Sequence, residues 1–218
     1  MNFGSTPRKR RFHRTQQAIL DASRAIIAAD GIAALSMRAI ADRIDYSVAG
    51  LYEYYAGKEE IIAELCIEGH QRFFQYLDEV DRSLPVRNYI DELGHAYLEF
   101  ARQNPDYFVL IFTTAPIAVQ GGHLPIPDDS AEGKEPLEPI RTDSTFDLLV
   151  AGLQRGVDEG VFLHHPDRPV LDMALGLWGM VHGMAMLQVT TMRGMPVDFD
   201  HVRRMMFSIL AQGLATPE

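Results

Sequence analysis

The chain has 218 residues, of which 47% are hydrophobic, and it carries a formal net charge of −10 at pH 7. Its single cysteine, Cys66, excludes an internal disulfide and any multi-cysteine metal site, and the length suffices for a substantial core in one or two domains. Residues 1–58 hold nine Lys/Arg against five Asp/Glu, whereas residues 59–218 hold eleven against twenty-five, a distribution typical of a nucleic-acid-binding head on an acidic body.

The N-terminal fifteen residues are basic and have no apolar period. We therefore expect residues 1–15 to form a flexible arm, which either contacts phosphates or only aids solubility. Since no apolar run follows the basic residues, the sequence predicts no secretory signal. The arm carries these cations: Arg8, Lys9, Arg10, Arg11 and Arg14.

A first helix is predicted from about Gln16 to Ala29. Ile19, Ala22 and Ile26 recur at helical spacing and would form its buried stripe. Gly31 follows as a residue that readily ends a helix.

Residues 36–58 have the spacing of a helix-turn-helix that leads into a further helix. Ser36 and Ser47 each stand where an N-cap is needed, eleven residues apart. The turn between the two helices needs a residue that tolerates a left-handed backbone, and Asp45 does so at modest cost. Each helix then has one apolar face, formed by Ile40, Ala41 and Ile44 in the first and by Val48 and Leu51 in the second.

The residues left facing outward are polar, aromatic or basic, which suits a DNA major groove. An ordinary helical hairpin on a surface is the alternative, but the caps, the spacing of the apolar residues and the basic side chains together favour a DNA-binding motif. We expect phosphate contacts from Arg38, Tyr52, Tyr54 and Lys58. Ser47, Val48, Ala49 and Gly50 would lie nearest the base edges, with few hydrogen bonds to bases and more specificity from DNA shape.

From about Gln16 to Leu65 the chain resembles the TetR family of transcriptional repressors, through the pieces LSMRAIADRI, YSVAGLYEYY and KEEII. Three positions depart from the family pattern. Asp45 stands where the family usually has Gly, Gly50 where it often has Thr or Ser, and Tyr54 where many members have His. Gly50 lacks a side chain that could touch DNA, while the Tyr54 hydroxyl could still reach a phosphate.

The rest of the chain also reads as helical, so the predicted fold is all-α with about nine helices. Pro85 and Pro105 each open a helix, because the missing amide is not needed in a first turn. Residues 116–139 contain five prolines and no apolar period, which predicts a long loop. Helices are expected over about 58–80, 85–103, 106–115, 139–159, 167–192 and 198–215.

Residues 173–187 form the most apolar segment. Its fifteen residues are fewer than the about twenty that a membrane-spanning helix needs, so we expect no membrane partner and a cytoplasmic protein. Eight of the ten methionines lie in residues 173–206, and adaptable methionines suit a pliant pocket or a dimer seam. Glycines recur in the segment at a spacing that lets another helix pack closely: Gly176, Gly179 and Gly183. A homodimer through residues 167–192 and 198–215 is the expectation.

Trp178, His182 and Gly183 resemble the Trp-x-x-x-His-Gly pattern of a subset of TetR-family C-terminal domains. His182 is either a core or interface histidine or a ligand contact. In the family this body encloses a small-molecule cavity, and the resemblance implies a small apolar or aromatic effector. The expected lining residues are Phe74, Tyr97, Phe100, Phe108, Phe112, Trp178 and His182.

We expect no enzymatic activity, no cofactor and no metal, since no phosphate loop, His-Glu-x-x-His pair or nucleophile elbow occurs. The predicted organisation is an arm (1–15), a DNA-binding domain (16–57) and a ligand-binding and dimerisation domain (58–218). The leading hypothesis is a homodimeric repressor that binds a pseudo-palindromic operator in double-stranded DNA and is released by the effector. The alternatives are a DNA-binding regulator without an effector, and a helical enzyme or carrier with a vestigial DNA head.

Overall fold

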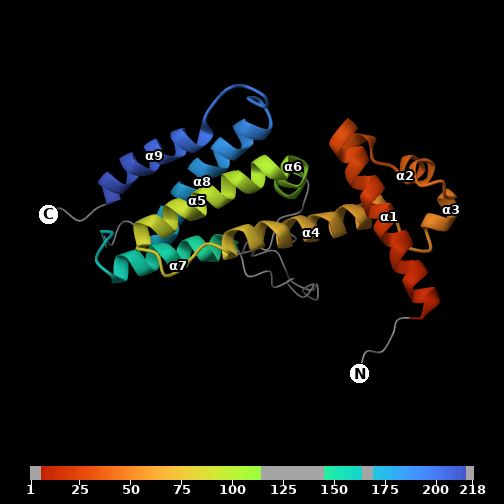
Figure 1. The fold of residues 1–218 in the computed structure, drawn as a ribbon, viewed down its shortest axis with the longest axis horizontal. Helices are drawn as coiled ribbons and strands as arrows, with labels where there is room; N and C mark the ends of the chain where they lie inside the picture. Colours follow the sequence, from red (N-terminus) through yellow and green to blue (C-terminus); the bar gives the residue numbers. More distant parts are fainter. Residues whose placement is uncertain (1–5, 114–144, 164–168, 215–218) are drawn as a thin grey trace, which may run out of the picture. The chain divides into compact units, whose positions relative to one another are not determined.

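The computed structural model describes residues 6–113, 145–163 and 169–214. Within these ranges the chain forms nine α-helices and one 3-10 helix and contains no β-strand, which confirms the all-α prediction (Figure 1). The chain divides into two compact units, Met1–Glu68 and Gly69–Glu218. The division falls inside α4 (Lys58–Asp78), whereas the functional boundary predicted between residues 57 and 58 stands at the start of this helix.

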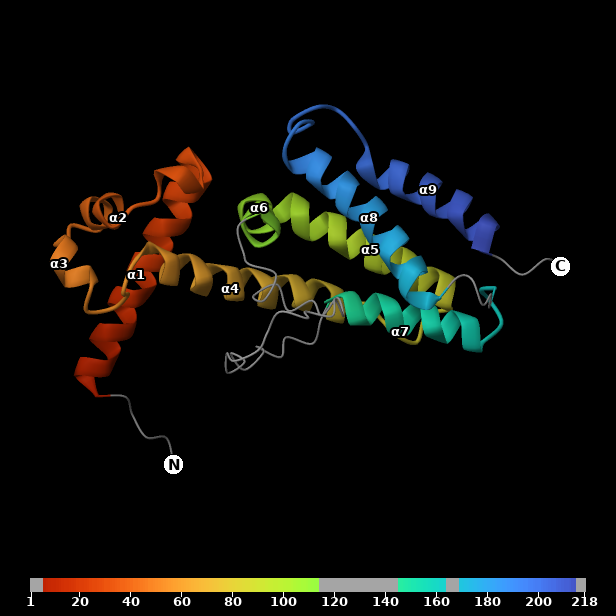
Figure 2. The same ribbon diagram turned by 180° about the vertical axis from the view of Figure 1, so that it is seen from behind.

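The first unit contains α1 (Pro7–Asp30), a 3-10 turn (Ile32–Ala34), α2 (Met37–Arg43), α3 (Val48–Leu51) and the first half of α4. Figure 2 shows α2 and α3 following one another beside α1. Each helix of the unit contributes buried apolar residues to its core. Its most buried members include Ile19, Ile40, Leu51, Ile61 and Leu65.

Helix α1 begins nine residues earlier than the sequence indicated. Pro7 occupies its first turn, and the Thr6 side chain caps it by accepting a hydrogen bond from the Lys9 amide at 3.4 Å. The prediction of a flexible arm over residues 1–15 is therefore wrong from Pro7 onward, and residues 1–5 lie outside the described ranges. The buried stripe of Ile19, Ala22 and Ile26 is confirmed.

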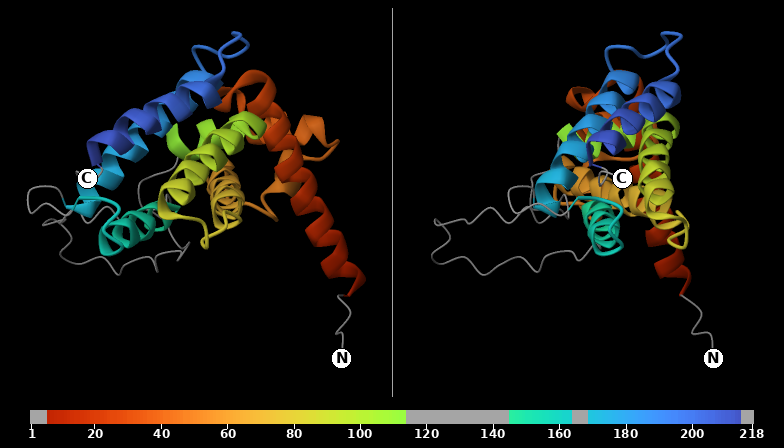
Figure 3. Two further views of the ribbon diagram at one scale, coloured as in Figure 1. Left: turned by 60° about the vertical axis from the view of Figure 1, so that its left-hand side comes forward. Right: turned by 90° about the vertical axis from the view of Figure 1, so that its left-hand side faces the viewer.

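The second unit is built around α5 (Val86–Gln103), which packs against α6 (Pro105–Thr113), α7 (Thr145–Asp158), α8 (Val170–Val189) and α9 (Phe199–Leu214). Figure 3 shows these helices from two further sides. Pro85 caps α5 and Pro105 opens α6, as predicted. The predicted loop 116–139 and the start of the helix expected from 139 lie outside the described residues.

Helix α8 spans twenty residues, so the argument that this segment is too short for a membrane does not hold. By length and composition it is apolar enough to cross a bilayer, and it is the one such helix in the described part of the chain. It packs, however, on four helices of the second unit, α5, α6, α7 and α9, and its inner face belongs to their common core. We therefore describe α8 as a core helix of a bundle.

Candidate functional site

The two serines predicted as caps hold the helix-turn-helix in place. The Ser36 hydroxyl accepts a hydrogen bond from the Ala39 amide at 3.1 Å, and the Ser47 hydroxyl accepts one from the Gly50 amide at 3.0 Å. Each satisfies an amide that the first turn of a helix leaves without a partner. A side chain also caps the start of α4, because the Glu60 carboxylate accepts a hydrogen bond from the Ala56 amide at 2.6 Å.

The turn between α2 and α3 adopts the left-handed backbone that the sequence predicted. Asp45 has φ 53°, and among the described residues it is the one non-glycine residue with positive φ. The Tyr46 amide, directly after it, donates to the Ala41 carbonyl at 2.9 Å. This reversal lets α3 begin one residue after Ser47.

Most of the predicted DNA-contact residues are accessible in the first unit. Arg38, Ser47, Ala49 and Tyr52 are exposed, whereas Gly50, Tyr54 and Lys58 are half-buried. Val48, which the sequence analysis also assigned to the packed face of its helix, is 37% exposed, so that packing assignment is wrong. Only Leu51 supplies the buried face of α3.

Two residues near this surface were missed by the sequence analysis, Phe12 and Tyr46, and Arg11 was assigned to a flexible arm instead of a helix. The Phe12 ring stacks on Tyr54 with 4.7 Å between centroids and 29° between planes. The Tyr46 and Tyr54 hydroxyl oxygens lie 3.5 Å apart. Phe12 lies seven residues before the buried Ile19, a helical spacing that could have revealed an earlier start of α1.

The second unit contains an aromatic cluster around His182. Six of the seven predicted effector residues belong to it, while Phe73, rather than the predicted Phe74, contributes the ring from α4. The imidazole stacks with Trp178 at 5.2 Å between centroids and meets Phe112 edge-on at 4.7 Å. The cluster consists of Phe73, Tyr97, Phe100, Phe108, Phe112, Trp178 and His182.

A hydrogen bond joins two polar side chains of this cluster. The Tyr97 hydroxyl and His182 Nδ1 lie 2.8 Å apart, and the tautomer of the imidazole decides which of the two donates. The Trp178 side chain is a further hydrogen-bond partner of Tyr97. Burial raises the pKa of Tyr97 well above its usual value and lowers that of His182, so both side chains are neutral at pH 7.

The cluster is packed rather than hollow within the described residues. A cavity of about 30 Å³, lined in part by Tyr97, Phe146 and Trp178, borders it, and this volume holds a water molecule but no drug-sized ligand. A larger pocket of about 350 Å³ lies between α5 and α9, where Arg87, Asp91 and Phe207 contribute to its wall. None of the predicted effector residues lines that larger pocket.

One face of α8 and α9 presents apolar and small residues outward. A Cβ added at Gly176, Gly179 or Gly183 would meet no atom within 4 Å, so this face is flat and open within the chain. Large apolar side chains are exposed on the same two helices: Leu187 at 44%, Met205 at 48% and Ile209 at 56%.

Two family models match the chain. Residues 19–65 match the model of bacterial regulatory proteins of the tetR family, and residues 90–210, more than half of the chain, match the tetracyclin repressor-like C-terminal domain. The chain belongs to the TetR family. The first match begins at Ile19, so the basic first turns of α1 precede the segment that TetR-family members share by this model.

Two curated relatives are similar to part of the chain. The chain is 29% identical over 94 residues to the uncharacterized HTH-type transcriptional regulator YobS of Bacillus subtilis (strain 168), covering 43% of this chain and 49% of YobS. It is 32% identical over 78 residues to the HTH-type transcriptional repressor KstR of Rhodococcus jostii (strain RHA1), a match that covers 36% of this chain and 35% of KstR. The match thus spans less than half of the length of either relative.

A solved structure shows that the resemblance in fold extends over the whole chain. A bacterial regulatory protein in the tetR family from Rhodococcus RHA1 is 17% identical, with a TM-score of 0.66 over 94% of this chain and 99% of that one. At this identity the likeness concerns the fold alone. The narrower assignment to a Trp-x-x-x-His-Gly subset stays a prediction.

Proposed function

We propose that this chain is a homodimeric transcriptional regulator that acts in the cytoplasm, binds double-stranded DNA through its first unit and responds to a small apolar effector through its second. Repression is the proposed output, with release of the operator when the effector binds. Membership of a family of bacterial regulatory proteins supports this proposal. The KstR relative is itself a transcriptional repressor by name.

The observation that carries the DNA-binding proposal is the geometry of residues 36–58. Two serine caps and one left-handed aspartate fix α2 and α3, and the exposed face they present bears Arg38, Ser47 and Tyr52. A short helix whose N-terminal residues are exposed in this way suits entry into a major groove. The excess of cations over residues 1–58 provides the attraction to phosphates.

The open face of α8 and α9 supports a dimer. Exposed Leu187, Met205 and Ile209 would be covered in a symmetric interface, and the three open glycines allow a second helix to approach closely. Two heads joined in this way would read two half-sites of a pseudo-palindrome one helical turn apart, about 34–36 Å.

The aromatic cluster supports an apolar effector with a hydrogen-bond acceptor. When Tyr97 donates to His182 Nδ1, the imidazole proton lies on Nε2, and an effector that enters beside Trp178 would meet a neutral N–H donor among rings. Because the second unit is acidic, a neutral or cationic effector is favoured over a large anion. Binding would require the rings to move apart, since the cavity beside them has room only for water.

Helix α4 is the proposed link between effector and DNA. Its C-terminal half brings Phe73 to the aromatic cluster, and its first residue is the predicted phosphate contact Lys58. An effector that separates Phe73 from Tyr97 would bias the position of this helix. The effect on DNA can be no larger than the difference in effector affinity between the two positions.

DNA binding is tested by selecting duplexes from a random 40-bp library and measuring affinity by fluorescence anisotropy at several salt concentrations. Lys58→Ala should reduce the slope of log K against log salt by about 0.9, because one fewer phosphate is neutralised. Arg82→Ala, which removes one cation from the second unit, is the matched control and should leave the slope unchanged. Lack of salt-dependent binding by the wild type would contradict the proposal.

The effector is tested by a thermal-shift screen of apolar compounds, with DNA release measured for every hit. A true effector raises the melting temperature and weakens DNA binding together, and Trp178→Ala should abolish both effects. The packed state of the cluster favours a second candidate, a regulator controlled without a small molecule. That candidate predicts DNA binding with no compound that shows both effects.

A further inference from the structure

Tyr46 covers the position at which α3 lacks a side chain. A Cβ built on Gly50 would lie 2.6 Å from Tyr46 Cε1 and 2.9 Å from Ser47 Oγ, so any larger residue there would displace the tyrosine ring. The ring is 39% exposed. The surface over the middle of α3 is therefore supplied by Tyr46, from the residue that precedes the cap.

Tyr46 belongs to a continuous row of aromatic side chains that reaches α1. Its ring meets Tyr54 edge-on at 6.3 Å, and Tyr54 stacks in turn on Phe12 at 4.7 Å. Phe12 is 38% exposed and lies in the second turn of α1. Because an offset aromatic stack is worth about a factor of 2 to 10 in an equilibrium, this contact holds the first turns of α1 beside the residues that follow α3.

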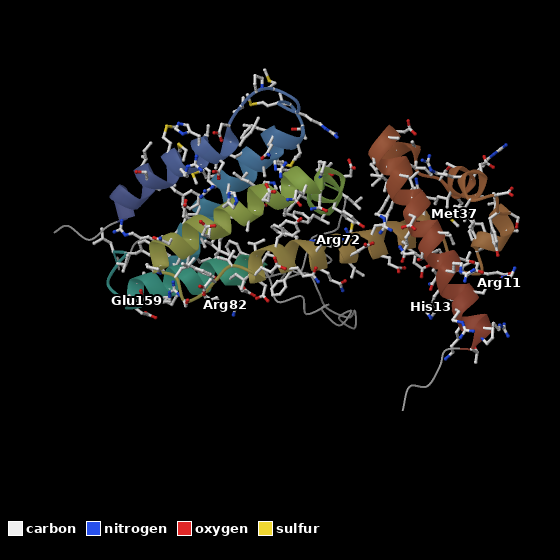
Figure 4. All side chains as sticks on the ribbon, in the orientation of Figure 1. Arg11, His13, Met37, Arg72, Arg82 and Glu159 are labelled. Carbon is white, nitrogen blue, oxygen red and sulfur yellow. The ribbon has the colours of Figure 1, made fainter. Side chains whose placement is uncertain are left out.

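Arg11 adds a cation to the same row. Figure 4 shows it on the N-terminal half of α1, on the side of the α2–α3 segment. The hydrogen bond with Tyr54 raises the pKa of Tyr46, and the charge of Arg11 acts in the opposite direction, which places the guanidinium within electrostatic range of the Tyr46 hydroxyl. The two tyrosine hydroxyl oxygens lie 3.5 Å apart, so when one donates to the other, the second hydroxyl can still donate its proton to a phosphate oxygen.

We propose that Arg11, Tyr46 and Tyr54 form one DNA-contacting ridge, positioned by Phe12, which extends the interface from α3 to the first turns of α1. In this ridge Tyr46 takes the place of the side chain missing at Gly50. The partner is the phosphate backbone of double-stranded DNA beside the major groove that α3 enters. The inference rests on the proposed function, because it assumes that the first unit binds DNA.

The test compares three variants with the wild type on a duplex selected by the wild type and on a random-sequence duplex of equal length. Arg11→Ala should lower the salt slope by about 0.9 and weaken binding about eightfold at 0.1 M salt, with the loss shrinking toward 1 M. Tyr46→Phe should weaken binding about tenfold without a change in slope, because a hydroxyl contact with a phosphate releases no counterion.

Phe12→Ala tests the positioning role. It removes no charge, but it should lower the salt slope nearly as much as Arg11→Ala does, and adding Arg11→Ala to it should then cost little more. Arg82→Ala is again the control for the loss of one cation. Circular dichroism checks that each variant keeps the helix content of the wild type, as expected for side chains exposed by more than a third.

The outcomes separate the ridge from the proposed function. If the wild type binds no duplex in a salt-dependent way, the proposed function fails. If the wild type binds and all three variants match it, the ridge is not part of the interface. If Arg11→Ala lowers the slope while Phe12→Ala leaves it unchanged, the cations act as an independent tail, and the ridge is likewise overturned.

Discussion

Among the charged residues of the second unit, Arg203 should be the one whose substitution lowers the free energy of unfolding most. Its side chain is 3% exposed and joins α9 to α5 through the carboxylate and the carbonyl oxygen of Asp91, the latter at 2.7 Å. Nη2 and Nε also donate to Asp200 at 2.9 and 3.1 Å, and the guanidinium lies over the Phe207 ring. We predict that Arg203→Met, which keeps an apolar stem over the ring, strongly destabilises the unit.

The magnitude follows from the burial of the partners. Breaking a fully buried ion pair costs about 3–5 kcal/mol, because a charge is left without a partner. Asp91 and Asp200 are 34% and 35% exposed and can regain water, which reduces the expected loss to about 2–3 kcal/mol in the free energy of unfolding. For a chain of this size that corresponds to about 4–12 °C in melting temperature.

Arg204→Met provides the matched control. Arg204 is the next residue and also pairs with Asp200, but its side chain is 53% exposed, so its removal should cost less than about 1 kcal/mol. Urea unfolding of both variants at two protein concentrations separates intrinsic stability from dimer dissociation. Equal losses for Arg203→Met and Arg204→Met would refute the argument that burial sets the value of this ion pair.

Three further predictions concern the dimer, pH dependence and base readout. Gly179→Glu should yield monomers in sedimentation, as should a charged residue at position 206 in place of Met206. The control Ala151→Glu, at an exposed position of α7, should leave a dimer. If Gly179→Glu still forms a dimer, the interface lies elsewhere. Burial lowers the pKa of His182 below 6.5, so the imidazole takes up a proton more readily in the unfolded chain than in the folded one. The free energy of unfolding should therefore decline as the pH falls through 6.5, and the decline should be smaller in His182→Gln. A DNA complex should show few bidentate base contacts from residues 47–50.

The helix-turn-helix was predictable because its determinants are local. The caps at Ser36 and Ser47 each bind an amide three residues on, and the left-handed residue, Asp45, acts through its own backbone. None of these interactions depends on a distant part of the chain. The proline and glycine signals at Pro85, Pro105 and Gly31 succeeded for the same reason.

The start of α1 carries weaker local signals, the Thr6 cap, Pro7 and the spacing of Phe12 from Ile19, and the sequence analysis overlooked them. Its first turns are rich in arginine and show little apolar period, so the local pattern is that of a solvated tail. In the fold, the Thr6 cap and the stack of Phe12 on Tyr54 favour the helix. The second of these joins residues 42 positions apart, a contact that spacing along the sequence does not reveal.

The membership of the aromatic cluster was largely predictable, but its close packing was not. Helical spacing brought Trp178 and His182 to neighbouring positions, and hydrophobic faces brought the phenylalanines toward them. Whether such rings enclose a cavity depends on small differences between the space available and the side chains that fill it. The choice of Phe74 over Phe73 failed for a related reason, since a shift of one residue rotates a side chain by about 100° around its helix.

The departures of this chain from the TetR pattern are coupled in the structure. Considered one at a time, Gly50 removes a possible DNA contact and Asp45 makes the turn less favourable than glycine would. Together they belong to one arrangement: the left-handed turn at Asp45 directs Tyr46 over α3, and only glycine at position 50 leaves room for its ring. In the proposed interface, Tyr46 therefore supplies the side chain that α3 lacks at Gly50, and the two departures from the family pattern act together.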